Sequence, residues 1–304
     1  SDIDQENFDI NKIFGLVKCS VLANQKLRFA VLPKKKHNRL MFYTCENCST
    51  KLDPKYKCVC SEEQRKISST WTSIELQAAV NLYGYKIIEV FEIWDFKEKN
   101  TYNPPHSYGL FSGYMEMMFK IKEAASGFPD YCDTEEKKES YIKELDEKMN
   151  LKLDKKKNIL YNPGLRACSK LLLNSLWGKW AQALHGRSAY FTGDQESSLI
   201  KLLLDPSKNV TNFTILSEDV INIVYDDLHE SNTFSTNEII AAFVTSSARL
   251  KLYDMIYKIE LNPQTSIAYF DTDSVMIKCH KDATLPDVNI GPALGQWCSE
   301  LRKS

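Results

Sequence analysis

The chain has 304 residues, of which 43% are hydrophobic and 26% are charged, a balance typical of folded globular proteins. Its formal net charge of −1 gives no reason to expect a nucleic-acid partner. No apolar run is long enough to span a bilayer. The first residues also lack the pattern of a signal peptide, so we expect an intracellular protein, with nucleus, mitochondrion and cytoplasm all left open.

The first third of the chain is predicted to consist of strands around a cysteine-rich insertion. Strand-like segments lie at 14–22, 27–33 and 39–43. The turn residues between them predict a short antiparallel meander. The cysteine-rich insertion follows at about 44–62, and the stretch 69–96 predicts a capped helix that ends near Gly84 and then a strand.

The rest of the chain has longer stretches with the apolar periodicity of helices. Helices are predicted at 108–127, at 134–150, at 162–184, and at 236–259. The segment 186–237 is polar and carries only short strand-like runs such as VINIVY. Because strands and helices mix without a regular βαβ alternation, we expect an α+β fold.

The stretch YFDTDSVMI places Asp271 and Asp273 one residue apart between apolar neighbours. The simplest geometry is a tight hairpin with both carboxylates at its tip, because aspartate side chains bond to nearby backbone amides in turns. Two carboxylates about 4 Å apart repel by roughly 4 kcal/mol at an effective dielectric near 20. Two interpretations stay open: turn-capping aspartates, or ligands of a hard divalent cation such as Mg²⁺ or Mn²⁺, which prefers carboxylate oxygens.

A basic segment contrasts with the neutral total. Residues 151–187 hold eight lysines and arginines and one acidic residue, Asp154. At about 100° per residue, one face of the predicted helix carries Arg166, Lys170, Asn174 and Trp177. The opposite face carries Leu172, Leu173, Leu176 and Trp180, and we expect this apolar face to pack on a hydrophobic core. Two cations one turn apart repel unless an anion bridges them, so this face suits a triphosphate; an ordinary solvated amphipathic helix is the alternative.

The nine cysteines are odd in number and unevenly spread, which indicates a reducing compartment in the absence of a secretion signal. Four of them fall in the stretch CENCSTKLDPKYKCVC: Cys45, Cys48, Cys58 and Cys60. Four thiolates at this spacing can surround a tetrahedral zinc ion with a structural role, although the final Cys-x-Cys is tighter than the usual Cys-x-x-Cys. Four thiols without a ligand are the alternative.

Two of these segments together resemble motifs of one enzyme family. The run KLLLNSLWGK resembles the Lys-x-x-x-Asn-Ser-x-Tyr-Gly motif in the fingers helix of family B DNA polymerases, and YFDTDS resembles the Tyr-x-Asp-Thr-Asp-Ser motif of their palm. The runs FGLVKC, TWTSIEL and IAAFVTSSARLKLY resemble the protein-primed branch, above all the polymerases of Polinton/Maverick elements and their viral relatives. The resemblance extends over nearly the whole chain and is weakest across 186–237.

The resemblance implies roles for the residues of both motifs. Asp273 would coordinate the catalytic magnesium ions, and Asp271 would support the site as a ligand or as a partner of the ligands. Lys170 and Arg166 would hold the incoming triphosphate. The pocket of the nascent base pair would be shaped by Asn174 and Trp177, the latter at the motif's usual tyrosine position.

The resemblance also implies partners and a division of the chain. Thr245 and Arg249, in TSSAR, match a Thr-x-x-Gly/Ala-Arg element that contacts DNA near the primer end. The implied partners are a DNA primer-template, deoxynucleoside triphosphates and a terminal priming protein, with no membrane. The implied parts are an antiparallel palm at 1–107 and 238–304, helical fingers at 108–183, and an irregular insertion between them at 184–237.

The chain departs from a complete family member. Family B polymerases take another metal-binding aspartate from an upstream Asp-x-x-Ser-Leu-Tyr-Pro strand, and this string does not occur here. Asp2, Asp4 and Asp9 are nearby carboxylates without that context. We also recognise neither the Lys-x-Tyr element and thumb nor an exonuclease domain, so we expect this chain alone to extend primers poorly or not at all.

Two other functions remain as alternatives. One is a catalytically inactive remnant of a mobile element that binds nucleic acid or a protein. The other is a magnesium-dependent phosphohydrolase, which would keep the paired aspartates but has no use for the aligned basic face. The intact DTDS and KLLLNS runs favour the polymerase.

Overall fold

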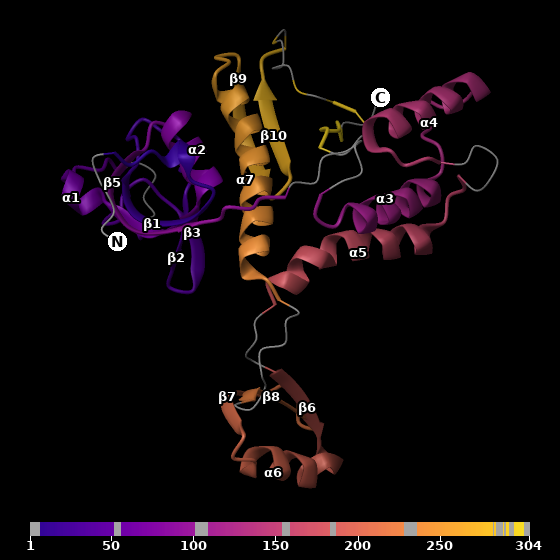
Figure 1. Ribbon diagram of the computed structural model, residues 1–304. Helices are drawn as coiled ribbons and strands as arrows, with labels where there is room; N and C mark the ends of the chain where they lie inside the picture. Colours follow the sequence, from indigo (N-terminus) through magenta and orange to yellow (C-terminus); the bar gives the residue numbers. More distant parts are fainter. Residues whose placement is uncertain are drawn as a thin grey trace. The chain divides into compact units, whose positions relative to one another are not determined.

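The computed structural model (Figure 1) describes residues 7–51, 56–100, 109–153, 159–182, 187–227, 236–281, 283, 288, 290–291 and 295–300. Asp2 and Asp4 lie outside these residues. The chain forms two compact units, the first of 1–173 with 242–304 and the second of 174–241. Among the helices described, none has both the length and the apolar character needed to cross a membrane.

The first unit contains a three-stranded antiparallel sheet in the order β4-β1-β5. Its strands are β1 (Gly15–Leu22), β4 (Ile67–Thr72) and β5 (Lys86–Asp95). Alternate residues of the central strand β1, from Val17 through Cys19 to Val21, are fully buried, as period-2 strand geometry requires for a face that packs on a core. The helix α2 (Ser73–Asn81) begins directly after β4 and buries Leu76 and Ala79 in that core.

A long helix and a hairpin complete this first core. They are α7 (Glu238–Glu260), β9 (Thr265–Asp271) and β10 (Ser274–Cys279). Ile256 and Ile259 of α7 and Ile267 of β9 are buried in the same hydrophobic cluster as β1 and α2. The rings of Phe29 and Phe270 meet edge to face at 5.3 Å, which adds a second contact between the hairpin and the amino-terminal part of the core. The hairpin therefore packs on the first core, although it is a separate two-stranded sheet.

Three helices of the first unit form a second core. They are α3 (Ser112–Ser126), α4 (Glu135–Met149) and the first part of α5 (Pro163–Trp180). The core includes Phe119 of α3, Tyr141 and Leu145 of α4, and Leu173 of α5 at its margin. The α4 helix is capped by Thr134, whose hydroxyl accepts from the amide of Lys137.

The second unit is a small sheet with one helix. Strands β6 (Arg187–Thr192), β7 (Lys208–Ile215) and β8 (Val220–Asp227) are antiparallel in the order β6-β8-β7. The turn η2 (Gly193–Gln195) leads into α6 (Glu196–Leu204), which follows β6. Ile223, on the central strand, is fully buried, while most of β7 is exposed.

Four short elements remain: η1 (Ile10–Lys12), the hairpin strands β2 (Pro33–Lys36) and β3 (Arg39–Phe42), and α1 (Glu62–Arg65). Asp9 caps η1 by accepting from the backbone amide of Asn11 at 3.0 Å. This capping role supports the expectation that Asp9 does not replace the upstream catalytic aspartate.

The structure confirms the mixture of helices and antiparallel strands and the hairpin at 265–279, but the predicted meander is wrong. Strand β1 pairs with β4 and β5, and 27–32 is irregular. The reason is that tyrosine hydroxyls satisfy its backbone: the amide of Val31 donates to Tyr85 at 3.2 Å, and the carbonyl of Ala30 accepts from Tyr253 at 2.9 Å. The segment 184–237 was expected to be irregular, but it contains β6, α6 and β7. These elements are largely exposed, so their sequences show little alternation of apolar and polar residues.

Candidate functional site

The tip of the β9–β10 hairpin carries the two aspartates. Asp271 pairs with Ser274, so Thr272 and Asp273 form a two-residue connection between the strands. The hydroxyl of Ser274 donates to the carbonyl of Asp271 at 3.1 Å, and the hydroxyl of Thr272 donates to its carboxylate at 3.0 Å. Thr272 has a φ of 45°, a left-handed conformation that is strained for a β-branched residue. The predicted tight hairpin with both aspartates at its tip is thus present.

Both carboxylates of this tip are exposed. No lysine or arginine in the part of the chain that the structure describes forms an ion pair with Asp271 or Asp273. Within the described ranges neither carboxylate has a cationic partner, and both present hard oxygen atoms from a short turn that is anchored on the first core. These oxygens fit a divalent cation such as Mg²⁺ or Mn²⁺, which takes few protein ligands and keeps water or phosphate oxygens for the others.

The helix α5 begins where its sequence predicts. The side-chain oxygen of Asn162 accepts from the amide of Leu165 at 3.0 Å, and Pro163 occupies the first helical position, where no amide hydrogen is needed. The backbone amide of Asn162 donates to the carbonyl of Ala125 at 2.9 Å. Tyr114 of α3 donates its hydroxyl to the carbonyl of Leu172 at 2.9 Å. Local capping and contacts with α3 therefore set the position of α5 in the second core.

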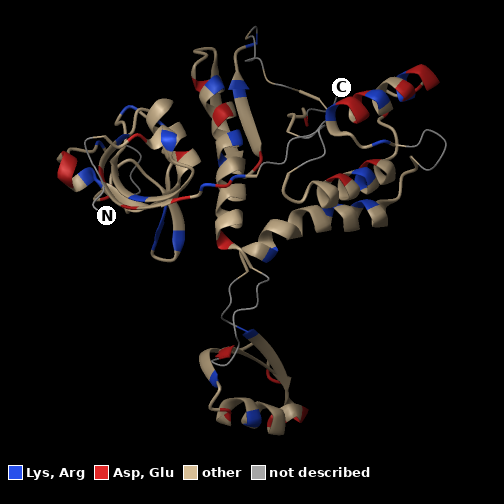
Figure 2. Cartoon of the chain, viewed as in Figure 1, with Lys and Arg blue, Asp and Glu red and all other residues tan. Residues whose placement is uncertain are grey.

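The two cations predicted to bind phosphate lie one turn apart on α5, and both are exposed. The Nε of Arg166 donates to the hydroxyl of Ser126 at 3.1 Å, so this guanidinium is oriented by the end of α3. Lys170 forms no ion pair or hydrogen bond with any residue that the structure describes. The helix contains no acidic residue, whereas α4 carries both signs of charge along its length (Figure 2). An anion can reach both side chains without displacing a carboxylate of any residue that the structure describes.

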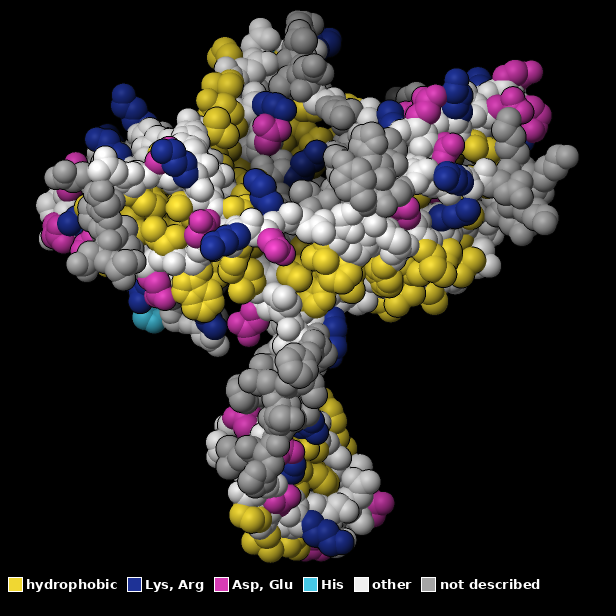
Figure 3. Space-filling view, viewed as in Figure 1, with side chains coloured by type: hydrophobic (Ala, Val, Ile, Leu, Met, Phe, Trp, Pro, Cys, Tyr) yellow, Lys and Arg dark blue, Asp and Glu magenta, His cyan; other side chains and the backbone are white. Residues whose placement is uncertain are grey.

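The apolar face of α5 differs from the prediction. Ser169 is buried and Leu173 packs on the second core, but Leu171 and Leu172 remain 67% and 45% exposed. Figure 3 shows hydrophobic side chains gathered over α5. The expectation that Leu172 packs on a core is wrong, because only the narrow row through Ser169 and Leu173 faces the second core. Leu176 and Trp180 are partly buried, while Asn174 and Trp177 are exposed; all four belong to the second unit.

Arg249 of α7 is engaged inside the first unit. Its Nε and Nη2 donate to the two carboxylate oxygens of Glu75 at 2.7 and 3.1 Å, and Glu75 is only 4% exposed. The hydroxyl of Ser246 donates to the same carboxylate at 2.8 Å. Thr245 donates its hydroxyl to the carbonyl of Ala242 at 3.0 Å. Sequence reasoning missed Glu75, although an acidic residue beside the buried Leu76 and Ala79 was a usable signal.

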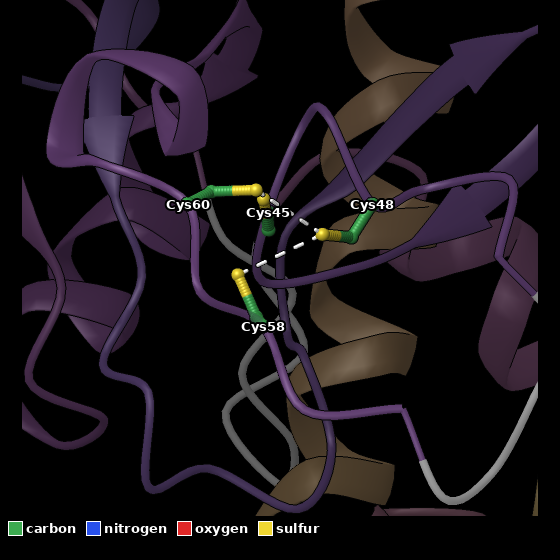
Figure 4. A group of neighbouring side chains, drawn as sticks. All are labelled: Cys45, Cys48, Cys58 and Cys60. Carbon is green, nitrogen blue, oxygen red and sulfur yellow. Dashed lines mark hydrogen bonds between the residues drawn. The ribbon is translucent and has the colours of Figure 1, made fainter.

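Four cysteines gather in the insertion (Figure 4), as their spacing predicts. Their sulfur atoms all lie within 4.8 Å of one another, and that of Cys48 is 3.7 Å from that of Cys58 and 3.5 Å from that of Cys60. The nine cysteines are all free. The amide of Asn47, which donates to the sulfur of Cys60, lowers the pKa of that thiol to about 7, and burial raises the pKa of Cys45 to about 12. The four thiols form a candidate metal centre.

Part of the chain is similar to a known protein family. The family model for DNA polymerase type B, organellar and viral, matches residues 130–261, less than half of the chain. The matched range contains α4, α5 and α7 and ends before the hairpin that carries Asp271 and Asp273. No curated protein and no solved structure gives a significant match. The match supports a B-family DNA polymerase fragment and, at the level of the family, DNA-directed DNA polymerase activity.

Proposed function

We propose, from the type B DNA polymerase match, that this chain is the palm and fingers part of a template-directed polymerase that transfers nucleotides from deoxynucleoside triphosphates to a DNA 3′-hydroxyl. The observation that carries the proposal is the pair of exposed carboxylates, Asp271 and Asp273, on the hairpin that follows the matched segment. No cation among the described residues pairs with either of them. A carboxylate pair of this kind suits the metal-assisted phosphoryl transfer of polymerases.

The division into palm and fingers draws support from the two cores. The first core combines residues from 10–90 with residues from 252–267, which is what a palm at 1–107 and 238–304 requires. The second core draws on residues from 119–153, within the proposed fingers at 108–183. The second unit, 174–241, contains the whole of the proposed insertion at 184–237 and extends beyond it at both ends.

The proposed reaction assigns separate tasks to the two motifs. Asp273, with Asp271 in support, would hold the divalent ions. Ions held there would supply activation of the primer hydroxyl and stabilisation of the leaving pyrophosphate. Lys170 and Arg166 would bind the triphosphate and spread its charge, and this chemistry needs no covalent nucleophile.

The remaining site residues have supporting tasks in the proposal. Asn174 and Trp177 would line the pocket of the nascent base pair, where the exposed indole can stack on a base. Thr245 and Arg249 were expected to contact DNA. The contact between Arg249 and buried Glu75 favours a different task for Arg249, which is to position α7 and the hairpin that follows it. Priming from a terminal protein stays part of the proposal through the resemblance to the protein-primed branch.

The proposal is tested by metal-dependent nucleotide binding. The purified chain with a fluorescent primer-template should bind the complementary deoxynucleoside triphosphate more tightly in Mg²⁺ or Mn²⁺ than in a chelator. The double variant Asp271→Asn/Asp273→Asn should lose this metal dependence and retain affinity for DNA. Primer extension, run in parallel, should also be abolished by the double variant wherever the unsubstituted chain shows it.

Two results would count against the proposal. Nucleotide affinity that is equal with and without metal would remove the reason to assign the aspartates to metal binding. DNA binding without any preference for the complementary nucleotide would instead support the inactive nucleic-acid-binding remnant. The double variant Asp130→Asn/Asp133→Asn, at paired exposed aspartates before α4, is the matched control and should behave like the unsubstituted chain.

A further inference from the structure

We propose that Cys45, Cys48, Cys58 and Cys60 bind one zinc ion, which fixes the cysteine-rich insertion on the β2–β3 hairpin. This structural metal site is separate from the proposed polymerase chemistry and does not depend on it. The four thiols come from two short segments, one directly after β3 and one directly before α1.

The spacing of the sulfur atoms fits tetrahedral coordination. Zinc–sulfur bonds of about 2.3 Å place the sulfur atoms of a tetrahedral site about 3.8 Å apart. The sulfur of Cys48 lies 3.7 Å from that of Cys58 and 3.5 Å from that of Cys60, and all four sulfurs lie within 4.8 Å of one another. Small shifts of side chains, without rearrangement of the backbone, are enough to enclose an ion.

The type of ligand selects the metal. The group consists of four thiols without a carboxylate or imidazole, a set that suits zinc and not magnesium or calcium. The amide of Asn47 donates to the sulfur of Cys60 at 3.3 Å, and such hydrogen bonds to ligand sulfurs are typical of the surroundings of metal sites. Because all four positions of a tetrahedron are filled by protein, the ion would have a structural role.

Apolar burial contributes little to holding the conformation of the insertion. Among the described residues between β3 and α1, Cys45 and Ser49 are buried, whereas Val59 is 87% exposed. Apolar burial of this size does not offset the entropy of ordering such a segment. Metal binding can offset this entropy. Because the site forms only on folding, the free energy of metal binding adds to the free energy of folding.

The cysteine loop is connected to β2 through Glu46, which lies between two of the proposed ligands. The Nζ of Lys34 and the Nζ of Lys36 donate to its two carboxylate oxygens at 3.0 and 3.1 Å, and the hydroxyl of Tyr43 donates to it at 2.7 Å. Lys36 also donates to the hydroxyl of Ser49 at 2.6 Å. An ion that fixes Cys45 and Cys48 therefore also fixes this network, and it joins the insertion to the hairpin.

The direct test is the metal content of the full chain. The chain, purified under reducing conditions from zinc-containing medium without chelator, should hold about one equivalent of zinc by mass spectrometry of the metal. The double variant Cys48→Ser/Cys58→Ser should hold little. The matched control, Cys168→Ser/Cys298→Ser, removes two exposed cysteines outside the cluster and should keep the zinc. Folded chain without zinc, or equal zinc in the two double variants, would overturn the proposal.

A second measurement does not depend on folding of the variant. Cobalt added to the metal-free, reduced chain should produce the visible absorption of a tetrahedral thiolate site, and one equivalent of zinc should remove it. Chelation should also speed tryptic cleavage at Lys51 and Lys57 in the insertion, with little effect at Lys143 of α4. Cleavage at these sites that is equally fast with and without zinc would contradict the structural role. Recovery of Cys48–Cys58 or Cys48–Cys60 disulfides, with no bound metal, would also contradict the proposed zinc site.

Discussion

Arg249 and Glu75, 174 residues apart in the chain, form a two-pronged ion pair within the first unit, with Nε to Oε1 at 2.7 Å and Nη2 to Oε2 at 3.1 Å. The glutamate side chain is only 5% exposed and that of the arginine 24%. Ser246 and Thr72 also donate to the same carboxylate, so α7 is tied to the start of α2 through one buried charge.

Replacement of Arg249 by alanine should destabilise the chain. Removal of one partner leaves the buried charge of Glu75 uncompensated, which costs about 3 kcal/mol or more in unfolding free energy. Urea unfolding measures this loss. The matched control is Arg28→Ala, which breaks the exposed pair of Arg28 with Glu260 and should cost less than about 1 kcal/mol. A variant Arg249→Ala with unchanged stability and weakened DNA binding would instead favour direct contact of Arg249 with DNA.

Replacement of Lys170 by alanine should weaken binding of the incoming nucleotide. The lost charge-assisted hydrogen bonds are worth about 1.5–3 kcal/mol, or roughly tenfold or more in affinity. Titration of the chain and primer-template with a complementary deoxynucleoside triphosphate measures the change. Lys179→Ala is the control, since Lys179 lies on the same helix but on the opposite side from Lys170. Equal effects of the two substitutions would argue against a specific phosphate contact.

Replacement of Thr272 by asparagine should stabilise the hairpin tip. Thr272 has a φ of 45°, which asparagine tolerates better than a β-branched residue. The expected gain in unfolding free energy is about 0.5–1 kcal/mol. Thr70→Asn on strand β4, where the threonine is exposed and extended, serves as the comparison and should be neutral or slightly destabilising. A loss of stability at Thr272 would show that its hydroxyl bond to Asp271 outweighs the backbone strain.

Stability should fall at alkaline pH. Burial raises the pKa of Cys19 from 9.0 to about 12 and that of Tyr83 from 10.0 to about 12. The unfolded chain therefore loses these protons first, and unfolding free energy declines as pH rises above about 9. Urea unfolding at a series of pH values measures the decline. The variant Cys19→Ala should show a shallower decline than the unsubstituted chain, and an identical slope would contradict the role of this thiol.

Local features of the chain were predictable because their causes lie within a few residues. Pro163 and the apolar period mark α5, and Asp-Thr-Asp between apolar runs marks the β9–β10 hairpin. The spacing of Cys45, Cys48, Cys58 and Cys60 likewise predicts a cluster, since a short loop can bring its own ends together. These elements carry most of the candidate site residues.

Other features depended on partners far along the chain. The segment 27–32 has the composition of a strand, but hydroxyls of Tyr85 and Tyr253 satisfy its backbone, and β1 pairs with β4 and β5 instead. The exposure of Leu171 and Leu172 depends on how little of α5 meets α3, which periodicity does not reveal.

The sequence by itself determined helices α2, α3, α4, α5 and α7, the aspartate turn and the four-cysteine loop, because capping, turn chemistry and short-loop closure act locally. Only the tertiary structure decided that Arg249 meets Glu75 and that Glu46 ties the cysteine loop to β2. The physical reason is that such charges are matched by side chains brought together by packing, and no local pattern encodes which side chains those will be.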